Sequence, residues 1–550
     1  MIFIHNFAPK YTAKLIELGI AKKGDGFKIT QHYATPEELK FNNIAKVGGE
    51  LYNTVKELGS CFYIDRLQGG TFYSEYPYDE ELLSEYEGIT DFLGFQLHEL
   101  GTTRMLDWCR IDRQLKAFGF EKTEENIIEA VRAVSANKVV LHFSQGRPSE
   151  YAEKEMPRTL TEAFADIESV IVKAMERTKN RVFNCDAGTM LAAIDTRLGL
   201  PLSFIEVGCQ TKFSRLQYAL RRGASRSTGA KWGAYLEPWS HMENGTTCYC
   251  FMRDGSNEWF VGGEGFAYHH DGERGGSSMS YAKRMMYYSL FSGADYFSEE
   301  WGQSNTFYDF ESFELSPYGR IKKEFCDFAE DFKDVKAYAP IAIVIPSEYG
   351  VFNTHTRIFP YESVTDDTEG GRRMETAERI VSFCYNGKNL GSEDVYFSNG
   401  ICPSVFDVIF DDSYTEIPKD YEFVIDLSGR LELSERVFDG WDDGIYGKIK
   451  EFAGEALPIC VNADGDLDYL IFKNNGRKYA AVFNHSGVSK SVERGEETNP
   501  EASVKLCVTA KHGKITRLFN LTDADCRLED EKLCGVLRGG EFVAFEYVEF

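Results

Sequence analysis

The sequence predicts an α/β protein built on a (β/α)8 (TIM) barrel, followed by a small flavodoxin-like α/β domain and a C-terminal antiparallel β-sandwich. Over the first 335 or so residues, short apolar strand-like segments alternate with amphipathic helices, which is typical of such a barrel. Several of these strands end on an acidic residue. The last hundred or so residues instead contain short alternating strands separated by turns. We therefore predict domains at residues 1–335, 336–455 and 456–550.

The predicted barrel elements follow one another along the chain. Strands are expected at residues 1–7, 61–66, 92–99, 139–143, 182–186, 204–207, 232–237 and 294–301. Helices are expected at about 35–58, 110–137, 159–179, 213–227, 280–292 and 318–332. Thr35-Pro36-Glu37-Glu38 is a typical start for the first of these helices.

The pattern changes after residue 335. Strands at 340–345, 405–410 and 423–426, with a helix near 375–385, predict a layered α/β domain. This domain contains no Gly-rich phosphate loop, so we expect no nucleotide there. Residues 479–483, 503–508 and 542–546 then predict strands of the sandwich.

Composition restricts the partners and the compartment. The formal net charge of -26 argues against nucleic acid and anionic membranes, which bind Lys/Arg patches. No apolar run is long enough to span a membrane, and the N-terminus lacks the features of a signal peptide. The 13 cysteines show no zinc-ligand spacing, which favours reduced thiols. We expect a cytoplasmic protein without metal or other cofactor.

Acidic residues close several of the predicted barrel strands. They are Glu99, Asp186, Glu206, Glu237 and the pair Glu299-Glu300, and Asp65 with Arg66 is a further candidate. Because the carboxyl ends of barrel strands share one face, these carboxylates are expected to converge. Convergent carboxylates suit glycoside hydrolysis, in which one acts as an acid and the other as a nucleophile or base. They also suit divalent-metal binding.

Aromatic and polar residues near these strand ends fit a carbohydrate site. Trp108, Trp239 and Trp301 are candidates for stacking on sugar rings, and Arg66 and His98 for binding hydroxyl groups. A single Glu at a strand end is more often an ordinary surface residue, but several in the same topological position favour function. His269 and His270 suggest a metal, although adjacent histidines in a Gly-rich loop are more often a mobile polar lip.

The three-domain order resembles that of family 42 β-galactosidases and related barrel glycosidases. The segment from Gly276-Ser277 to Gly293-Ala294-Asp295 resembles the helix and Gly-Ala-Asp entry to their eighth strand. The resemblance implies that Glu237, on the preceding strand, is the nucleophile, and that the middle domain serves trimerisation.

The chain departs from this family at strand four. The family carries an Asn-Glu acid/base pair at the end of that strand, whereas the predicted fourth strand here ends in Ser144-Gln145. Either the acid comes from elsewhere, with Glu99 and Glu206 as the choices, or the strand count is off by one. If residues 1–7 are not a barrel strand, Asp186 closes strand four and another strand lies within 246–266.

These observations lead to one hypothesis and two alternatives. The hypothesis is an intracellular, retaining glycoside hydrolase acting on oligosaccharides, with Glu237 as nucleophile and Glu99 or Glu206 as acid/base. Asp186 and Glu299 would hold substrate hydroxyls or tune the acid.

One alternative is a metal-dependent carbohydrate lyase or isomerase that uses the same carboxylates with His98 or His269. The other is an inactive sugar-binding barrel. We expect a carbohydrate partner and a homo-oligomer, a trimer or a dimer.

Overall fold

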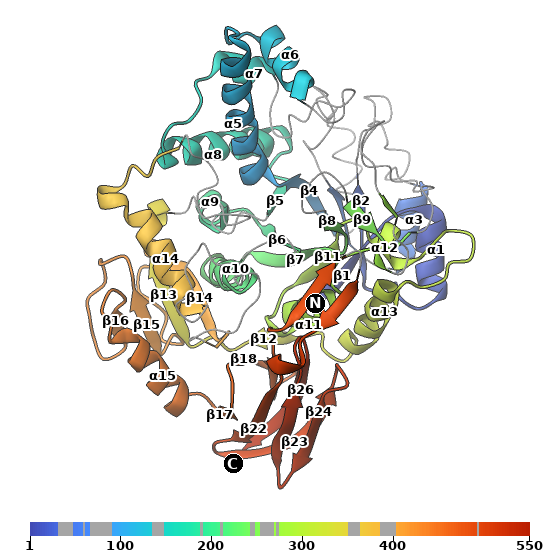
Figure 1. Cartoon of the computed structure of the whole chain (residues 1–550), viewed down its shortest axis with the longest axis vertical. Coiled ribbons are helices and arrows are strands. Elements are labelled where there is room, and N and C mark those ends of the chain that lie inside the picture. Colours follow the sequence, from blue (N-terminus) through green and yellow to red (C-terminus); the bar gives the residue numbers. More distant parts are fainter. Residues whose placement is uncertain are drawn as a thin grey trace.

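The computed structural model describes thirteen stretches of the chain. They are residues 1–30, 48–58, 61–65, 91–134, 148–186, 191–208, 213–241, 248–252, 269–270, 274–349, 364–384, 403–491 and 494–550. Figure 1 shows a central barrel ringed by helices, a smaller α/β part at the left and antiparallel sheets at the bottom.

Eight parallel strands close into the predicted barrel, in the order β1-β11-β7-β6-β5-β4-β3-β2. Their bounds are β1 Ile2–Asn6, β2 Gly26–Thr30, β3 Phe62–Asp65, β4 Phe92–His98, β5 Val182–Asp186, β6 Leu202–Gly208, β7 Lys231–Glu237 and β11 Tyr296–Glu299. The closed parallel sheet confirms the fold class.

Two strands of the predicted barrel need correction. The second strand is β2, a segment for which we predicted no strand. The strand predicted at 139–143 lies outside the described residues, and the barrel closes without it because β4 pairs directly with β5. Residues 2–6 do form a barrel strand. The fourth strand therefore ends at His98, and Glu237 keeps its place on the seventh.

The barrel helices follow their strands along the chain. They are α1 Pro9–Glu17, α3 Glu50–Leu58, α5 Leu100–Phe118, α6 Glu124–Val134, α7 Pro148–Glu153, α8 Leu160–Arg177, α9 Ala192–Leu198, α10 Ser214–Thr228, α11 Met279–Phe291, α12 Gly302–Thr306 and α13 Pro317–Ala329. Local sequence fixes several of their ends. Thr159 and Glu162 form a capping box at the start of α8, and Ser316 caps α13, which has Pro317 in its first turn.

The lower interior of the barrel is apolar. Ile4, Tyr63, Phe204, Tyr235 and Tyr296 belong to one buried cluster, each from a different strand. A Cβ atom on Gly233 would lie 2.3 Å from the Phe204 ring, so only glycine leaves room for that ring. This packed layer is the floor on which the polar residues of the mouth stand.

A second, parallel sheet has the order β14-β13-β15-β16. Its strands are β13 Ile341–Ile345, β14 Phe406–Phe410, β15 Phe423–Asp426 and β16 Val437–Asp439, with helices α14 Arg372–Cys384 and α15 Ile445–Glu455. This 2-1-3-4 order is that of flavodoxin-like folds. The sheet packs on barrel helix α10, where a Cβ atom on Gly223 would lie 2.2 Å from the Val408 carbonyl oxygen.

Two larger antiparallel sheets and one two-stranded ribbon form the C-terminal part. Their strands are β12 Val335–Ala337, β17 Ile459–Ala463, β18 Asp468–Asn474, β19 Arg477–Phe483, β20 Val488–Ser491, β21 Gly495–Thr498, β22 Val504–Ala510, β23 Gly513–Asn520, β24 Asp525–Glu529, β25 Lys532–Leu537 and β26 Phe542–Glu549. β12 pairs with β18, so residues just beyond the barrel join this distant sheet. The predicted domain boundaries themselves stay a prediction.

Candidate active site

A polar layer stands above the apolar floor of the barrel. Side chains alternate along a strand, so Asp65, Glu206 and Glu237 share the interior face with Tyr63, Phe204 and Tyr235, two positions earlier. All three carboxylates are buried, with at most 1% of each residue exposed. Three buried carboxylates at the same end of a barrel mark a candidate functional site.

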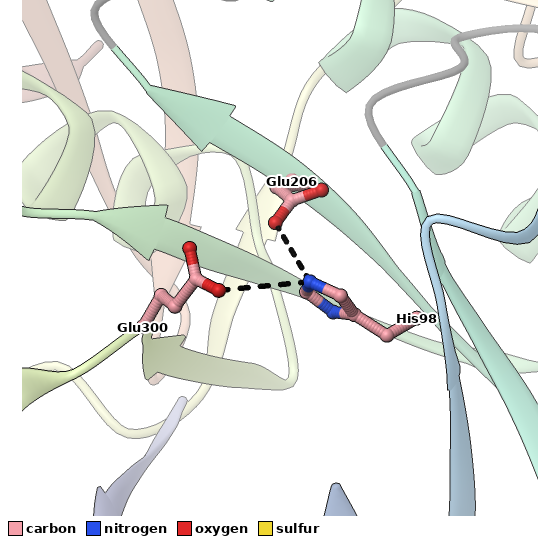
Figure 2. Close-up of side chains that lie close together, drawn as sticks. All are labelled: His98, Glu206 and Glu300. Atoms are coloured by element: carbon pink, nitrogen blue, oxygen red, sulfur yellow. Dashed lines mark ion pairs between the residues drawn. The ribbon is translucent and has the colours of Figure 1, made fainter. Parts of the chain in front are cut away.

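His98, the last residue of β4, lies between carboxylates from two other strand ends. Its Nε2 atom is 3.5 Å from Oε1 of Glu206, at β6, and 3.6 Å from Oε1 of Glu300, just after β11. Figure 2 shows the ring nitrogen facing both carboxylates. Glu99 Oε2 lies 3.9 Å from the same nitrogen. Of the predicted site residues, His98, Glu99 and Glu206 thus lie together.

Glu300 is held by a tryptophan that the sequence had marked for sugar stacking. Nε1 of Trp239 donates a hydrogen bond of 2.7 Å to Oε2 of Glu300. The rings of Trp239 and Trp301 lie 5.5 Å apart, and the two residues are only 6% and 5% exposed. The structure thus places Trp239 as a partner of the carboxylate, with Trp301 packed beside it.

An ion pair lies within the barrel near His98. Nζ of Lys28, on β2, is 3.2 Å from Asp65 Oδ2 and donates to the Tyr235 hydroxyl at 2.6 Å, while that hydroxyl donates to Asp65 at 3.2 Å. The Tyr235 ring contacts His98 edge-on at 5.5 Å. Asp65 is therefore a buried, paired carboxylate that orders the floor of the site. Lys28 and Tyr235 were missed because their partners are far away in the sequence.

Glu99 has an unusual backbone. It precedes α5 with φ 47° and ψ 33°, in the left-handed region that residues other than glycine seldom adopt. Its side chain is 32% exposed, in contrast to the buried Glu206 and Glu237. Such strain persists only where the surroundings impose it, and it gathers at functional sites. Glu99 follows the fourth barrel strand directly.

Three predicted site residues lie away from this group. Glu299 shares the outer face of β11 with Phe297, and it pairs with Lys322 and accepts a hydrogen bond from Tyr318, both on α13. Asp186 accepts a 2.6 Å hydrogen bond from the backbone N–H of Gly101, at the start of α5. Trp108, on α5, donates to Asp166 at 2.9 Å. Arg66 lies outside the described residues.

Glu299 was predicted to hold substrate hydroxyls or tune the acid, but its neighbour Glu300 is the residue that faces the mouth. Successive residues of a strand point to opposite faces, so only one member of the pair reaches the mouth. The apolar floor decides which one: Tyr296 faces inward, Ser298 follows it, and Glu300 continues that series. Burial lowers the pKa of Lys322, but Glu299 and Tyr11 together more than offset this effect and the pKa is raised, so Lys322 stays charged beside Glu299.

Comparisons with known proteins give only distant likenesses. The sequence matches no family model and no curated protein. A GH42 β-galactosidase from G. stearothermophilus is 8% identical, with 99% of this chain and 98% of that chain covered and a TM-score of 0.49. Alpha-L-fucosidase isoenzyme 2 from Paenibacillus thiaminolyticus is 11% identical, with 100% of both chains covered and a TM-score of 0.41. An exo-beta-1,4-mannosidase from Opitutaceae bacterium strain TAV5 is 9% identical, with 78% of this chain and 72% of that chain covered and a TM-score of 0.33.

Likenesses of this degree do not indicate what activity this chain has.

Among the helices of the described stretches, none is long and apolar enough to cross a membrane.

Proposed function

We propose that this protein is a retaining glycoside hydrolase in which Glu237 is the nucleophile and Glu99 the acid/base. One observation carries the proposal: Glu99 directly follows the fourth strand of the closed barrel, and Glu237 ends the seventh. These are the two positions at which the family 42 pattern places its acid/base and its nucleophile. Residues 139–143 were predicted as the fourth strand, so Glu99 was not recognised at the acid/base position.

The environments of the two residues support this division of labour. A nucleophile must be ionised and fixed, and Glu237 is buried at the rigid end of β7. An acid/base must exchange protons with a leaving group and then with water, and Glu99 is partly exposed. Glu206 was the other choice for the acid/base, but it is fully buried against His98, so we assign it to holding the site together.

The proposed reaction has two steps. The Glu237 carboxylate attacks the anomeric carbon while Glu99 protonates the departing glycosidic oxygen. Glu99 then removes a proton from water, which releases the sugar from Glu237 with its original anomeric configuration. His98 and Asp65 line the same face: His98 would help to orient the sugar, and Asp65, paired with Lys28, would order the floor beneath it.

The test uses Glu237→Gln, Glu237→Gly and Glu99→Gln on a panel of aryl glycosides. Glu129→Gln, an exposed change on α6, is the matched control. We expect the control to cleave at the wild-type rate and the Glu237 variants to lose at least about 10³-fold in kcat/KM, because no second group supplies the covalent step. Full activity in either Glu237 variant would remove Glu237 as the nucleophile.

One observation favours the alternative of a metal-dependent carbohydrate lyase or isomerase. His98, Glu206 and Glu300 present three possible ligand atoms within 4.8 Å of one another. The two functions differ in their products, because a hydrolase releases a free reducing end and needs no chelatable ion for the steps above. Activity that disappears with a chelator and returns with Mn²⁺ or Zn²⁺, without release of a reducing end, would favour the alternative.

A further inference from the structure

Three buried side chains from three different strand ends meet at one point of the mouth. His98 comes from the end of β4, Glu206 from β6 and Glu300 from just after β11. They are 4%, 0% and 4% exposed, respectively. Their ligand-type atoms, one nitrogen and two oxygens, all lie within 4.8 Å of one another, and Figure 2 shows them facing a common space.

The distances from Nε2 of His98 to the oxygens of Glu206 and Glu300 are too long for direct hydrogen bonds. A ring N–H to oxygen bond spans about 2.7–3.2 Å, whereas Nε2 of His98 lies 3.5 Å and 3.6 Å from the two oxygens. Two atoms that are each about 2.0–2.1 Å from one zinc ion lie about 3.3 Å apart at tetrahedral angles and slightly more at wider angles. The distances from His98 to the two carboxylate oxygens therefore fit ligands that share one cation.

Supporting contacts orient one of the carboxylates as a ligand. Trp239 binds Oε2 of Glu300, so Oε1 is the oxygen turned toward His98. The backbone N–H of Glu300 also donates to the carbonyl oxygen of Leu236 at 2.7 Å, which ties this residue to β7. A hydrogen bond to the second oxygen of a carboxylate, on a rigid strand end, is the usual support of a metal ligand.

We propose that His98, Glu206 and Glu300 bind one divalent transition-metal ion, Zn²⁺ or Mn²⁺. One imidazole and two carboxylates suit these ions better than Mg²⁺ or Ca²⁺, which prefer oxygen alone. Three protein ligands leave at least one coordination position open toward the mouth. That a sugar hydroxyl takes this position rests on the proposed function; the ion site itself does not.

The experiment measures metal binding and not activity. The full chain is stripped with EDTA, and ZnCl₂ and MnCl₂ are titrated separately by calorimetry, with bound metal counted after desalting. We expect one ion per chain. His98→Ala and Glu206→Gln should lose this binding, and Trp239→Phe, which removes the hydrogen bond to Glu300 but keeps an aromatic ring beside Trp301, should weaken it about 10–100-fold. His512→Asn and Glu129→Gln, both exposed, should bind as the wild type does.

Two results would overturn the site: a wild-type chain that binds neither ion, or site variants that bind as tightly as the wild type. If His98→Ala does not fold, X-ray absorption of the zinc-loaded wild type decides, since the site requires one nitrogen ligand among oxygens. Glu237→Gln separates the two proposals, because it should keep the ion while losing glycoside cleavage. A wild type that holds the ion but cleaves no glycoside would contradict only the proposed function.

Discussion

At the scale of single residues, the face of a strand decides what a carboxylate does. Glu299 and Glu300 are neighbours, yet one pairs with Lys322 behind the barrel and the other faces His98 in the mouth. The sequence predicted that acids gather at the strand ends. It could not say which of two adjacent acids faces inward, because that depends on the register of β11 against β7.

Replacing Glu99 should have an effect that depends on the leaving group. A general acid matters most when the departing oxygen is basic, and it contributes about 10²–10⁴-fold. Glu99→Ala should therefore cleave dinitrophenyl glycosides at nearly the wild-type first-step rate but lose that factor on phenyl glycosides or oligosaccharides. The measurement is kcat/KM against the pKa of the leaving phenol. Equal losses on both substrates would mean that Glu99 is not the acid.

Removing the partner of the outer carboxylate should destabilise the fold. Lys322 and Glu299 are both fully buried, and Lys322→Met leaves Glu299 as an uncompensated charge. We expect a loss of about 3–5 kcal/mol in the free energy of unfolding, measured in urea. Lys283→Met breaks a pair with Glu324 in which the carboxylate is exposed, so it should cost only about 0–1 kcal/mol. Similar losses in the two variants would contradict the buried role of Glu299.

At the scale of elements, most of the barrel was predictable, and the exceptions have physical reasons. The helices at 159–179, 213–227, 280–292 and 318–332 agree with α8, α10, α11 and α13 to within a few residues, because their caps and periodicity are local. The strand β2 was missed because Gly26-Phe27-Lys28-Ile29-Thr30 is short and has a lysine at its centre. That lysine is tolerated inside the barrel only because Asp65, from the next strand, pairs with it.

A buried polar cluster joins barrel helices to the C-terminal sheets. Asp468, at the start of β18, accepts from Arg215 of α10 at 3.1 Å and contacts Nε2 of His485 at 3.2 Å, while Nδ1 of His485 faces Arg284 of α11 at 3.2 Å. Because a guanidinium only donates, Nδ1 must accept and the ring must be neutral. Burial accordingly lowers the pKa of His485 from 6.5 to about 3.

This lowered pKa predicts how stability depends on pH. Between pH 6.5 and 3 the unfolded chain binds a proton at His485 that the folded chain does not, so folding stability falls as pH falls through this range. The contribution of neutral His485 to the free energy of unfolding is complete above pH 6.5. Below pH 6.5 it declines by at most about 1.4 kcal/mol per pH unit. His485→Gln, which does not titrate, should flatten the curve of unfolding free energy between pH 6.5 and 4.5. An unchanged slope in the variant would assign the dependence to other groups.

At the scale of the whole molecule, barrel and C-terminal sheets share one apolar interface. Rings of α11 pack against β18, β19 and β26: Phe291 stacks on Phe472 at 4.6 Å, and Tyr288 and Tyr287 meet Phe483 and Phe542 at 5.5 Å and 5.2 Å. The sequence predicted both parts but not their contact, because the local pattern of a helix or strand does not determine which distant element it packs against. The expected homo-oligomer and the cytoplasmic location stay predictions.

This interface predicts cooperative unfolding of the two parts. Phe472→Ala removes a fully buried ring and should lower the free energy of unfolding by about 3–5 kcal/mol. The midpoint of urea unfolding should shift by the same amount whether it is followed by tryptophan fluorescence or by far-UV circular dichroism. Tryptophan fluorescence reports largely on the barrel. Phe550→Ala, at a residue 88% exposed, should change neither. A shift seen by only one probe would mean that the parts unfold separately.

The most direct test of Glu237 as the nucleophile is to trap the covalent intermediate. The chain is incubated with a panel of 2-deoxy-2-fluoro glycosides bearing activated leaving groups, digested and sequenced by mass spectrometry. The fluorine slows both attachment to the nucleophile and release from it, whereas the activated leaving group speeds only attachment, so a labelled carboxylate accumulates. We predict one sugar per chain, attached to Glu237 in the peptide that contains Trp232 to Trp239. Label on another carboxylate, or cleavage of a substrate with inversion of the anomeric centre, would rule out a retaining mechanism through Glu237.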